Sequence, residues 1–191
     1  NIGDSAFAYC SSIKSIIIPD SVTGIGYNAF AMCTNLAEII LPTNLKKVEL
    51  TVFNDTIWKT NTTTSEKPAG VTVENNIVYL NGSTLLGCIA TSAAQVTVKE
   101  GVKIIAGNAY SNFTSITSVI LPSTIEYIGF EAFLATSLSA VVIKATTPPE
   151  ISSSAFQTVS VVYVPDESVE LYRNAPIWAA HNIQPMSVIG L

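Results

Sequence analysis

The only histidine in this 191-residue chain is His181, which follows Trp178 close to the C-terminus. A catalytic or metal-ligating histidine needs partners, and no cysteine, second histidine or recognisable nucleophile motif stands near it. The carboxylates make no stronger case for acid–base chemistry, because they fall in different parts of the chain with no obvious pairing: Asp4, Asp20, Glu38, Asp55, Glu100, Glu126 and Glu150. We therefore predict that the protein is not an enzyme and holds no metal or cofactor, and that His181 makes a surface or packing contact.

Two of the three cysteines, Cys10 and Cys33, stand 23 residues apart, whereas Cys88 has no comparable neighbour. If the chain repeats with that spacing, Cys10 and Cys33 come into adjacent layers with their Cα atoms about 5 Å apart, which a disulfide can span. The alternative is that both are small apolar fillers of the interior, which suits free cysteine because it is among the most buried residue types. We prefer the filler interpretation and leave the disulfide as the alternative.

Composition and charge exclude several classes of protein. With 48% hydrophobic and 12% charged residues, the chain is long and apolar enough to bury a sizeable core. Its net charge of −5 and nine scattered Lys and Arg residues predict no nucleic-acid partner, because no basic stripe can form. The charge-free stretch 104–125 carries polar residues throughout, so we expect no membrane insertion within this chain.

The chain contains a sequence repeat, and the elements that the repeat forms would have to position any functional site. Ala-Phe or a related pair recurs, mostly 23 residues apart, and an aliphatic residue stands four positions before each pair: Ala6-Phe7, Ala29-Phe30, Val52-Phe53, Ala109-Tyr110, Ala132-Phe133 and Ala155-Phe156. Alternating aliphatic runs that end in proline follow at 13–19, 36–42 and 116–122. Each unit predicts one coil of a solenoid, with a strand on one wall and Phe30 or Phe133 filling the interior, and stacked coils predict a parallel sheet.

The predicted strands number seven, and they begin at Ile16, Ile39, Val71, Val96, Val119, Val141 and Val162. The polar stretch 59–70 predicts a loop expansion. Within 74–94 the Ala-Phe half is missing, and 77–80 and 83–86 around Asn81-Gly82 predict a hairpin with a type I′ turn. After Pro165 we expect a cap, with Asp166 at the start of a short helix and Trp178 packed near its end.

This pattern predicts one domain over 1–191 with four parts. Regular repeats occupy 1–58, the loop and hairpin insertion 59–94, regular repeats again 95–147, and a degenerate repeat with the C-terminal cap 148–191. Because the chain opens on half a repeat, we expect further repeats upstream.

The unit I-G-x-x-A-F-x-x-C-x-x-L-x-x-I-x-I-P-x-x-V, clearest over 2–22 and 25–45, resembles the BspA-type leucine-rich repeat. The hairpin over 74–89 is similar to a long variant repeat of that family, and the ending is similar to its C-terminal cap. The resemblance implies an α/β-type repeat solenoid, a right-handed leucine-rich-repeat coil with a parallel β-sheet, one β-hairpin insertion and a C-terminal cap. It also implies a secreted or cell-surface protein that binds host matrix proteins, cell-surface proteins or glycans.

The middle residue of each predicted strand must point outward, because side chains alternate along a strand. These residues are predicted to form one ladder about 29 Å long, which is our candidate binding face: Ile17, Ile40, Thr72, Thr97, Ile120, Val142 and Tyr163. Their β-branched character also suits a strand with no partner, so β-propensity alone is an alternative explanation. Two functions therefore stay open: a protein-binding or adhesion module, and a passive structural spacer or display domain of a larger surface protein. The hairpin is a competing binding element.

Overall fold

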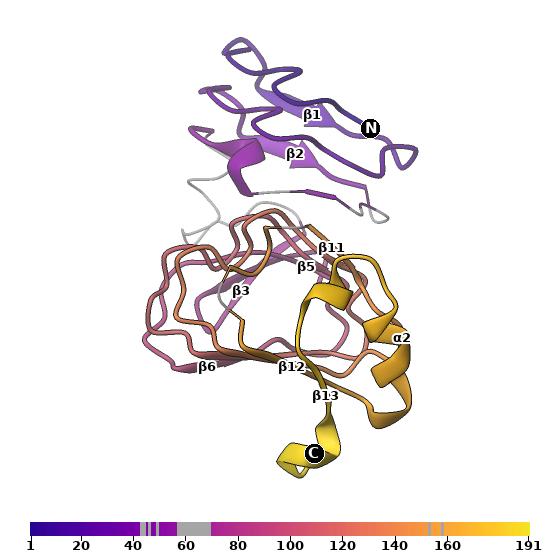
Figure 1. Ribbon diagram of the computed structural model, residues 1–191. Coiled ribbons are helices and arrows are strands. Elements are labelled where there is room, and N and C mark those ends of the chain that lie inside the picture. The colour runs from indigo at the N-terminus through magenta and orange to yellow at the C-terminus, as the bar shows by residue number, and fades with distance from the viewer. Residues whose placement is uncertain (43–44, 46, 49, 57–69, 153, 158) are drawn as a thin grey trace.

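The computed structural model describes residues 1–191 except 43–44, 46, 49, 57–69, 153 and 158 (Figure 1). The chain winds into coils whose strands pair in parallel. β1 (Ser15–Ile17) pairs with β2 (Glu38–Ile40), with Ile16 opposite Ile39. A second parallel sheet has five strands in the order β13-β12-β10-β8-β6, and its members are β6 (Gln95–Thr97), β8 (Ser118–Leu121), β10 (Ala140–Ile143), β12 (Val161–Val164) and β13 (Ile183–Pro185). The predicted parallel solenoid is confirmed.

The opposite wall of the solenoid is a six-stranded sheet in the order β11-β9-β7-β5-β4-β3. Its parallel part comes from the aliphatic position of successive repeats, in β7 (Ile104–Ile105), β9 (Tyr127–Ile128) and β11 (Glu150–Ile151). Its antiparallel part is a meander of β3 (Val71–Glu74), β4 (Ile77–Leu80) and β5 (Thr84–Cys88). In the turn between β4 and β5, Asn81 and Gly82 have φ of 49° and 69°, as a type I′ turn requires, so the predicted hairpin is confirmed.

The prediction of a single seven-stranded parallel sheet is wrong. β3 pairs antiparallel with β4, with Thr72 opposite Tyr79, and so belongs to the opposite wall. The strands from β3 to β5 pair with one another in an antiparallel meander. The expected ladder is therefore divided into the pair β1–β2 and the five-stranded sheet. Lys99, which stands where the regular repeats end in proline, bonds Glu74 at 2.8 Å and lies 4.0 Å from the centre of the Tyr79 ring. The loop predicted over 59–70 lies, apart from Gly70, outside the described residues.

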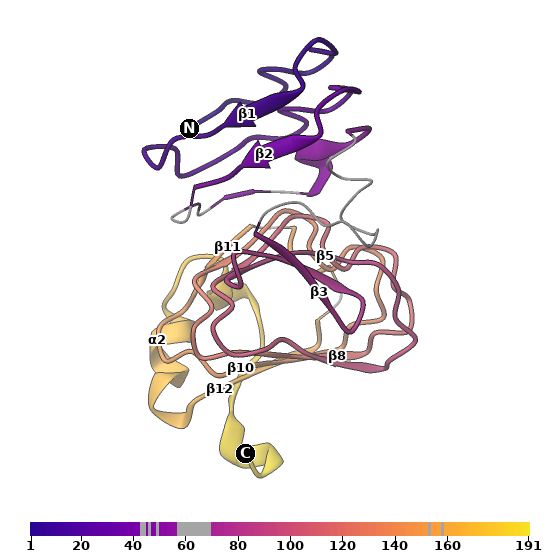
Figure 2. The ribbon, with the colours of Figure 1, turned by 180° about the vertical axis from the view of Figure 1, so that it is seen from behind.

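Two hydrophobic cores meet at the meander. Alternate residues of β4 face opposite ways: Ile77 and Tyr79 join the core of the C-terminal coils, whereas Val78 and Leu80 join the core of the N-terminal coils. Figures 1 and 2 agree that the first coils, with β1 and β2, lie over β3, β5 and β11. The five-stranded sheet is on the far wall, so the hairpin is a buried partition and not an exposed insertion.

Stacked aromatic rings fill the interior of both sets of coils, as the repeat predicts. Phe30 is 0% exposed and Phe133 2%, which confirms both as core residues. The ring of Phe30 lies parallel to those of Phe7 and Phe53, at centroid distances of 5.2 and 6.1 Å. In the C-terminal coils the rings of Tyr110, Phe133, Phe156 and Trp178 succeed one another at 5.2, 5.3 and 6.1 Å.

The glycine that follows the aliphatic residue of the repeat has a steric cause. A Cβ built on Gly129 would lie 2.4 Å from the backbone nitrogen of Gly107 in the preceding coil, a distance that no real contact reaches. At Gly3, in the first coil, a Cβ would meet no heavy atom within 4 Å. The glycine column is therefore needed where two coils approach closely.

Short helical segments form the remainder of the structure. η1 (Leu50–Phe53) lies in the third coil, and the cap contains η2 (Asp166–Ser168), α2 (Val169–Arg173), η3 (Trp178–Ala180) and η4 (Met186–Ile189). Asp166 does not cap its own helix as predicted, since its carboxylate instead accepts a hydrogen bond from the Ser187 N–H at 3.1 Å. The Trp178 indole N–H donates to the Pro149 carbonyl at 2.8 Å, which ties the cap to the last coil. No helix in the described part of the chain is long and apolar enough to cross a membrane.

Candidate functional site

The structure brings together four of the seven predicted face residues. Thr97, Ile120, Val142 and Tyr163 lie in register on adjacent strands of the five-stranded sheet, and Gln184 of β13 continues the row. We call these five residues the sheet face.

The other three predicted residues lie elsewhere. Ile17 and Ile40 are opposite each other on β1 and β2, where they are 71% and 55% exposed, and Thr72 is on the meander. The prediction missed Gln184, although Ile183-Gln184-Pro185 has the same strand-then-proline ending as the regular repeats.

The sheet face carries no charge. Thr97 is exposed, Ile120, Tyr163 and Gln184 are half-buried, and Val142 is buried. The neighbouring outward row is also uncharged, and it consists of Gln95, Ser118, Ala140 and Val161. Protein interfaces are depleted of charge at their centre and enriched in aromatic residues, so this surface suits a protein partner better than a small charged ligand.

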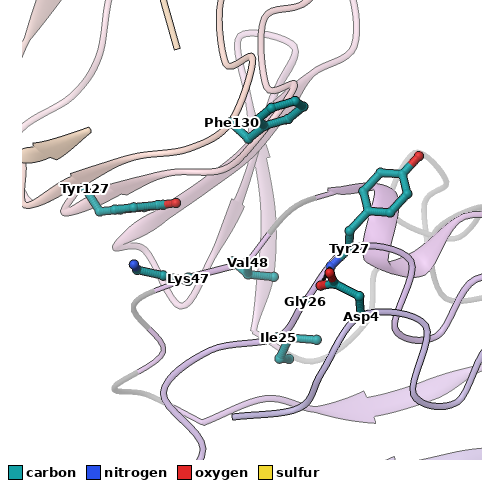
Figure 3. A pocket seen from close by; sticks show the side chains of 8 residues that line it. All are labelled: Asp4, Ile25, Gly26, Tyr27, Lys47, Val48, Tyr127 and Phe130. Atoms are coloured by element: carbon teal, nitrogen blue, oxygen red, sulfur yellow. Dashed lines mark hydrogen bonds between the residues drawn. The ribbon is translucent and has the colours of Figure 1, made fainter. Parts of the chain in front are cut away.

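A separate cleft of about 530 Å³ lies between the N-terminal and C-terminal coils (Figure 3). We call it the coil cleft, and its lining residues are Asp4, Ile25, Gly26, Tyr27, Lys47, Val48, Tyr127 and Phe130. The rings of Tyr27 and Phe130 are 49% and 44% exposed. Figure 3 shows them on opposite sides of the cleft, with Tyr127 beside Lys47. The volume falls within the range of about 300–1,000 Å³ that is usual for small-molecule sites.

Two charged groups are held in position at the walls of the coil cleft. The Asp4 carboxylate accepts a hydrogen bond from the backbone N–H of Tyr27 at 2.9 Å. The Lys47 ammonium bonds the Glu150 carboxylate and lies 5.3 Å from the centre of the Tyr127 ring. The hydrogen bond to Glu150 raises the pKa of Lys47.

The remaining chemistry-bearing side chains pack in the interior or at its edge. Cys10 and Cys33 are free thiols, and the Cys33 thiol donates to the Phe7 carbonyl at 3.0 Å, which favours the filler interpretation. Burial raises the pKa of the Cys33 thiol. His181 lies against the rings of Phe156 and Trp178, at centroid distances of 6.2 and 5.9 Å, so the predicted packing contact is confirmed. Within the described residues, no group of three or more His, Cys, Asp or Glu side chains could hold a metal ion.

Comparison with known proteins places this geometry in a family. The BspA type Leucine rich repeat region matches residues 1–68 and 64–163, in six copies. The chain belongs to the BspA-type leucine-rich repeat family. This BspA-type chain is therefore a repeat module, as its sequence indicates.

Solved structures of other bacterial leucine-rich repeat proteins resemble this BspA-type chain at low identity. A leucine-rich cell surface protein from Faecalibacterium prausnitzii is 19% identical, with a TM-score of 0.41 over 96% of this chain and 62% of that one. The T. pallidum leucine-rich repeat protein is 23% identical, with a TM-score of 0.33 over 74% and 50%. The pneumococcal vaccine antigen PcpA is 18% identical, with a TM-score of 0.37 over 96% and 38%. The chain thus spans less than two thirds of the length of each. No curated protein matches it.

The BspA-type repeat also explains where the cleft residues come from. Asp4, Tyr27 and Phe130 each stand two positions after the aliphatic residue of their repeat, whereas Lys47 and Tyr127 stand one position before it. Side chains next to an inward aliphatic residue point outward, which places Lys47 and Tyr127 on the outside of this wall. Asp4, Tyr27 and Phe130 lie in the turns that follow, and they line the cleft from there. The prediction missed all five residues. Aligning the repeats by column would have shown the aromatic and charged side chains gathered there.

Proposed function

We propose that this chain is a non-catalytic protein-binding module of a secreted or cell-surface protein, which acts in adhesion by holding a host matrix or cell-surface protein on its sheet face. Membership of the BspA-type family supports a repeat module of this kind. The observation that carries the proposal is the uncharged outward row in register across five parallel strands.

The geometry of the sheet face favours it over the hairpin as the binding element. All four residues of β4 are buried between the two cores, and four of the five residues of β5 are buried as well. The exposed residues of the hairpin are confined to its turns and ends, at 74–76, 81–82 and Ile89. The sheet face offers two large side chains, Ile120 and Tyr163, on either side of the buried Val142 at the middle of the row. Binding energy usually concentrates in a few residues inside the rim of an interface.

A binding screen with one matched pair of variants tests the proposal. The ligands are immobilised matrix proteins from which the glycans have been removed enzymatically. Ile120→Glu places a charge within the otherwise uncharged sheet face and should abolish capture. Ile40→Glu is the matched control, because it makes the same change at the same repeat position on β2, outside the sheet face, and it should leave capture unchanged.

The outcomes separate the open functions. If a folded Ile120→Glu protein still captures the ligand, the sheet face is not the site. If Ile40→Glu abolishes capture instead, the partner binds the N-terminal sheet. If the unaltered protein captures no member of the panel, the passive spacer becomes the better explanation. Circular dichroism of both variants verifies that each is folded.

A further inference from the structure

The coil cleft exposes aromatic rings on a concave surface, which packing of the core does not require. Tyr27 and Phe130 each leave almost half of their surface in water, whereas Phe30, Phe53, Tyr110 and Phe133 are buried. Exposed apolar surface gathered in a hollow marks an interaction site more often than a scattered exposed residue does. The cleft therefore has the shape and surface of a ligand site.

The charges of the cleft select against an ionic ligand. Asp4 supplies a carboxylate, Lys47 an ammonium, and Glu150 a second carboxylate bonded to Lys47. A ligand with a strong net charge of either sign would meet a group of like charge. A ligand that both donates and accepts hydrogen bonds, without net charge, can use both groups.

At Gly26 and Tyr27 the backbone of the N-terminal wall is already hydrogen-bonded within the wall. The Tyr27 N–H donates to the Asp4 carboxylate at 2.9 Å, and the Tyr27 carbonyl accepts from the Ser5 N–H at 2.8 Å. The Gly26 N–H donates to the Ile2 carbonyl at 2.9 Å. An extended peptide gains affinity by adding a strand to unpaired backbone groups, and the groups of Gly26 and Tyr27 are occupied. At these two residues a ligand meets side chains and not free backbone.

We propose that the coil cleft binds a short neutral oligosaccharide. A pyranose ring has flat C–H faces that pack on exposed aromatic side chains, here Tyr27 and Phe130. Its hydroxyl groups both donate and accept, so they can donate to the Asp4 carboxylate and accept from the Lys47 ammonium. A volume of about 530 Å³ has room for a short chain of sugar rings and not merely one. This site is separate from the sheet face, which lies on the far wall of the solenoid.

Saturation-transfer NMR and isothermal titration calorimetry test the site with defined probes. The main panel contains neutral glucan, mannan, galactan and N-acetylhexosamine oligosaccharides of a few units each. Two further arms contain sulfated glycosaminoglycan oligosaccharides and short peptides. We expect at least one neutral oligosaccharide to bind, and neither other arm to bind as tightly.

Three cleft variants and one control locate the binding. Tyr27→Ala and Phe130→Ala should each weaken binding by about tenfold or more, since each removes a packing face. Asp4→Asn keeps an acceptor for the Tyr27 N–H and loses the charge, so it should weaken binding less. Tyr9→Ala is the control: this ring is 74% exposed and outside the cleft, and alanine already occupies the same repeat position at Ala135.

The proposal is overturned if no neutral oligosaccharide binds, if only sulfated oligosaccharides or peptides bind, or if Tyr27→Ala and Phe130→Ala leave a measured affinity unchanged. Ile120→Glu, which should abolish protein capture, should leave oligosaccharide binding intact. Failure of this site can therefore be told apart from failure of the proposed protein-binding function.

Discussion

Replacing Phe30 by alanine should lower the free energy of unfolding by about 3–5 kcal/mol, as is typical when an aromatic core residue is truncated. Phe30 is 0% exposed, and its ring lies within 3° and 8° of parallel to the rings of Phe7 and Phe53. Alanine would remove the whole ring from between two others. The coil backbone fixes both neighbours, because the Phe7 N–H donates to Ala29 and the Phe30 N–H to Val52, at 2.8 and 2.9 Å. The cavity cannot close easily, so we expect about 4 kcal/mol.

Urea denaturation followed by far-ultraviolet circular dichroism measures this loss. Phe7→Ala is the matched control, because Phe7 is 36% exposed and ends the stack, and it should cost about 1–2 kcal/mol. A loss below about 1 kcal/mol for Phe30→Ala would mean that the Ala-Phe half of the repeat does not face inward. A larger loss for Phe7→Ala than for Phe30→Ala would refute the stacking argument in the same way.

Three further predictions follow from the packing. Gly129→Ala forces two coils apart and should cost about 1–3 kcal/mol in urea denaturation, whereas Gly3→Ala should stay within about 0.5 kcal/mol of the parent. Burial lowers the pKa of His181, so the unfolded chain takes up a proton at higher pH than the folded one. Stability should therefore be full above about pH 6.5 and fall as the pH drops through the folded pKa, and His181→Gln should reduce the difference between urea midpoints at pH 7 and pH 5. A thiol titration under denaturing, non-reducing conditions should count three thiols, and a count of one would reveal a disulfide between Cys10 and Cys33.

The repeat made the coil itself predictable, because each column of the pattern has one physical role. The inward aliphatic residues set the parallel register, as the pairing of Ile16 with Ile39 shows. The Ala-Phe column predicted that the phenylalanine rings fill the interior, and Asn81-Gly82 predicted the turn geometry. These features depend on contacts within a coil or with the next one, and a repeat pattern encodes such contacts directly.

The division of the sheet was not predictable in the same way, because it depends on which surface covers the second face of the meander. The run Ile77-Val78-Tyr79-Leu80 is apolar at every position, which is typical of a strand buried on both faces. This composition indicates that both faces of the strand are covered, but it does not identify what covers the second face. In the structure that cover is the core of the N-terminal coils, which reaches Val78 and Leu80. For this reason the predicted ladder, which included Thr72, does not lie on one sheet.

The sheet face and the coil cleft both use positions of the repeat that lie outside the core. This explains why the sequence predicted part of the sheet face and none of the coil cleft. Inward columns must repeat because each side chain packs on its counterpart in the next coil. These residues therefore determine the fold and contribute little to function. Outward columns are free to differ, as Asp4, Tyr27 and Phe130 do at one shared position. Predicting the sheet face required only the register of neighbouring strands, which follows from the repeat period. The coil cleft forms only where the two sets of coils meet across the buried hairpin. Its residues therefore come together in the folded structure, and no single part of the sequence pattern indicates them.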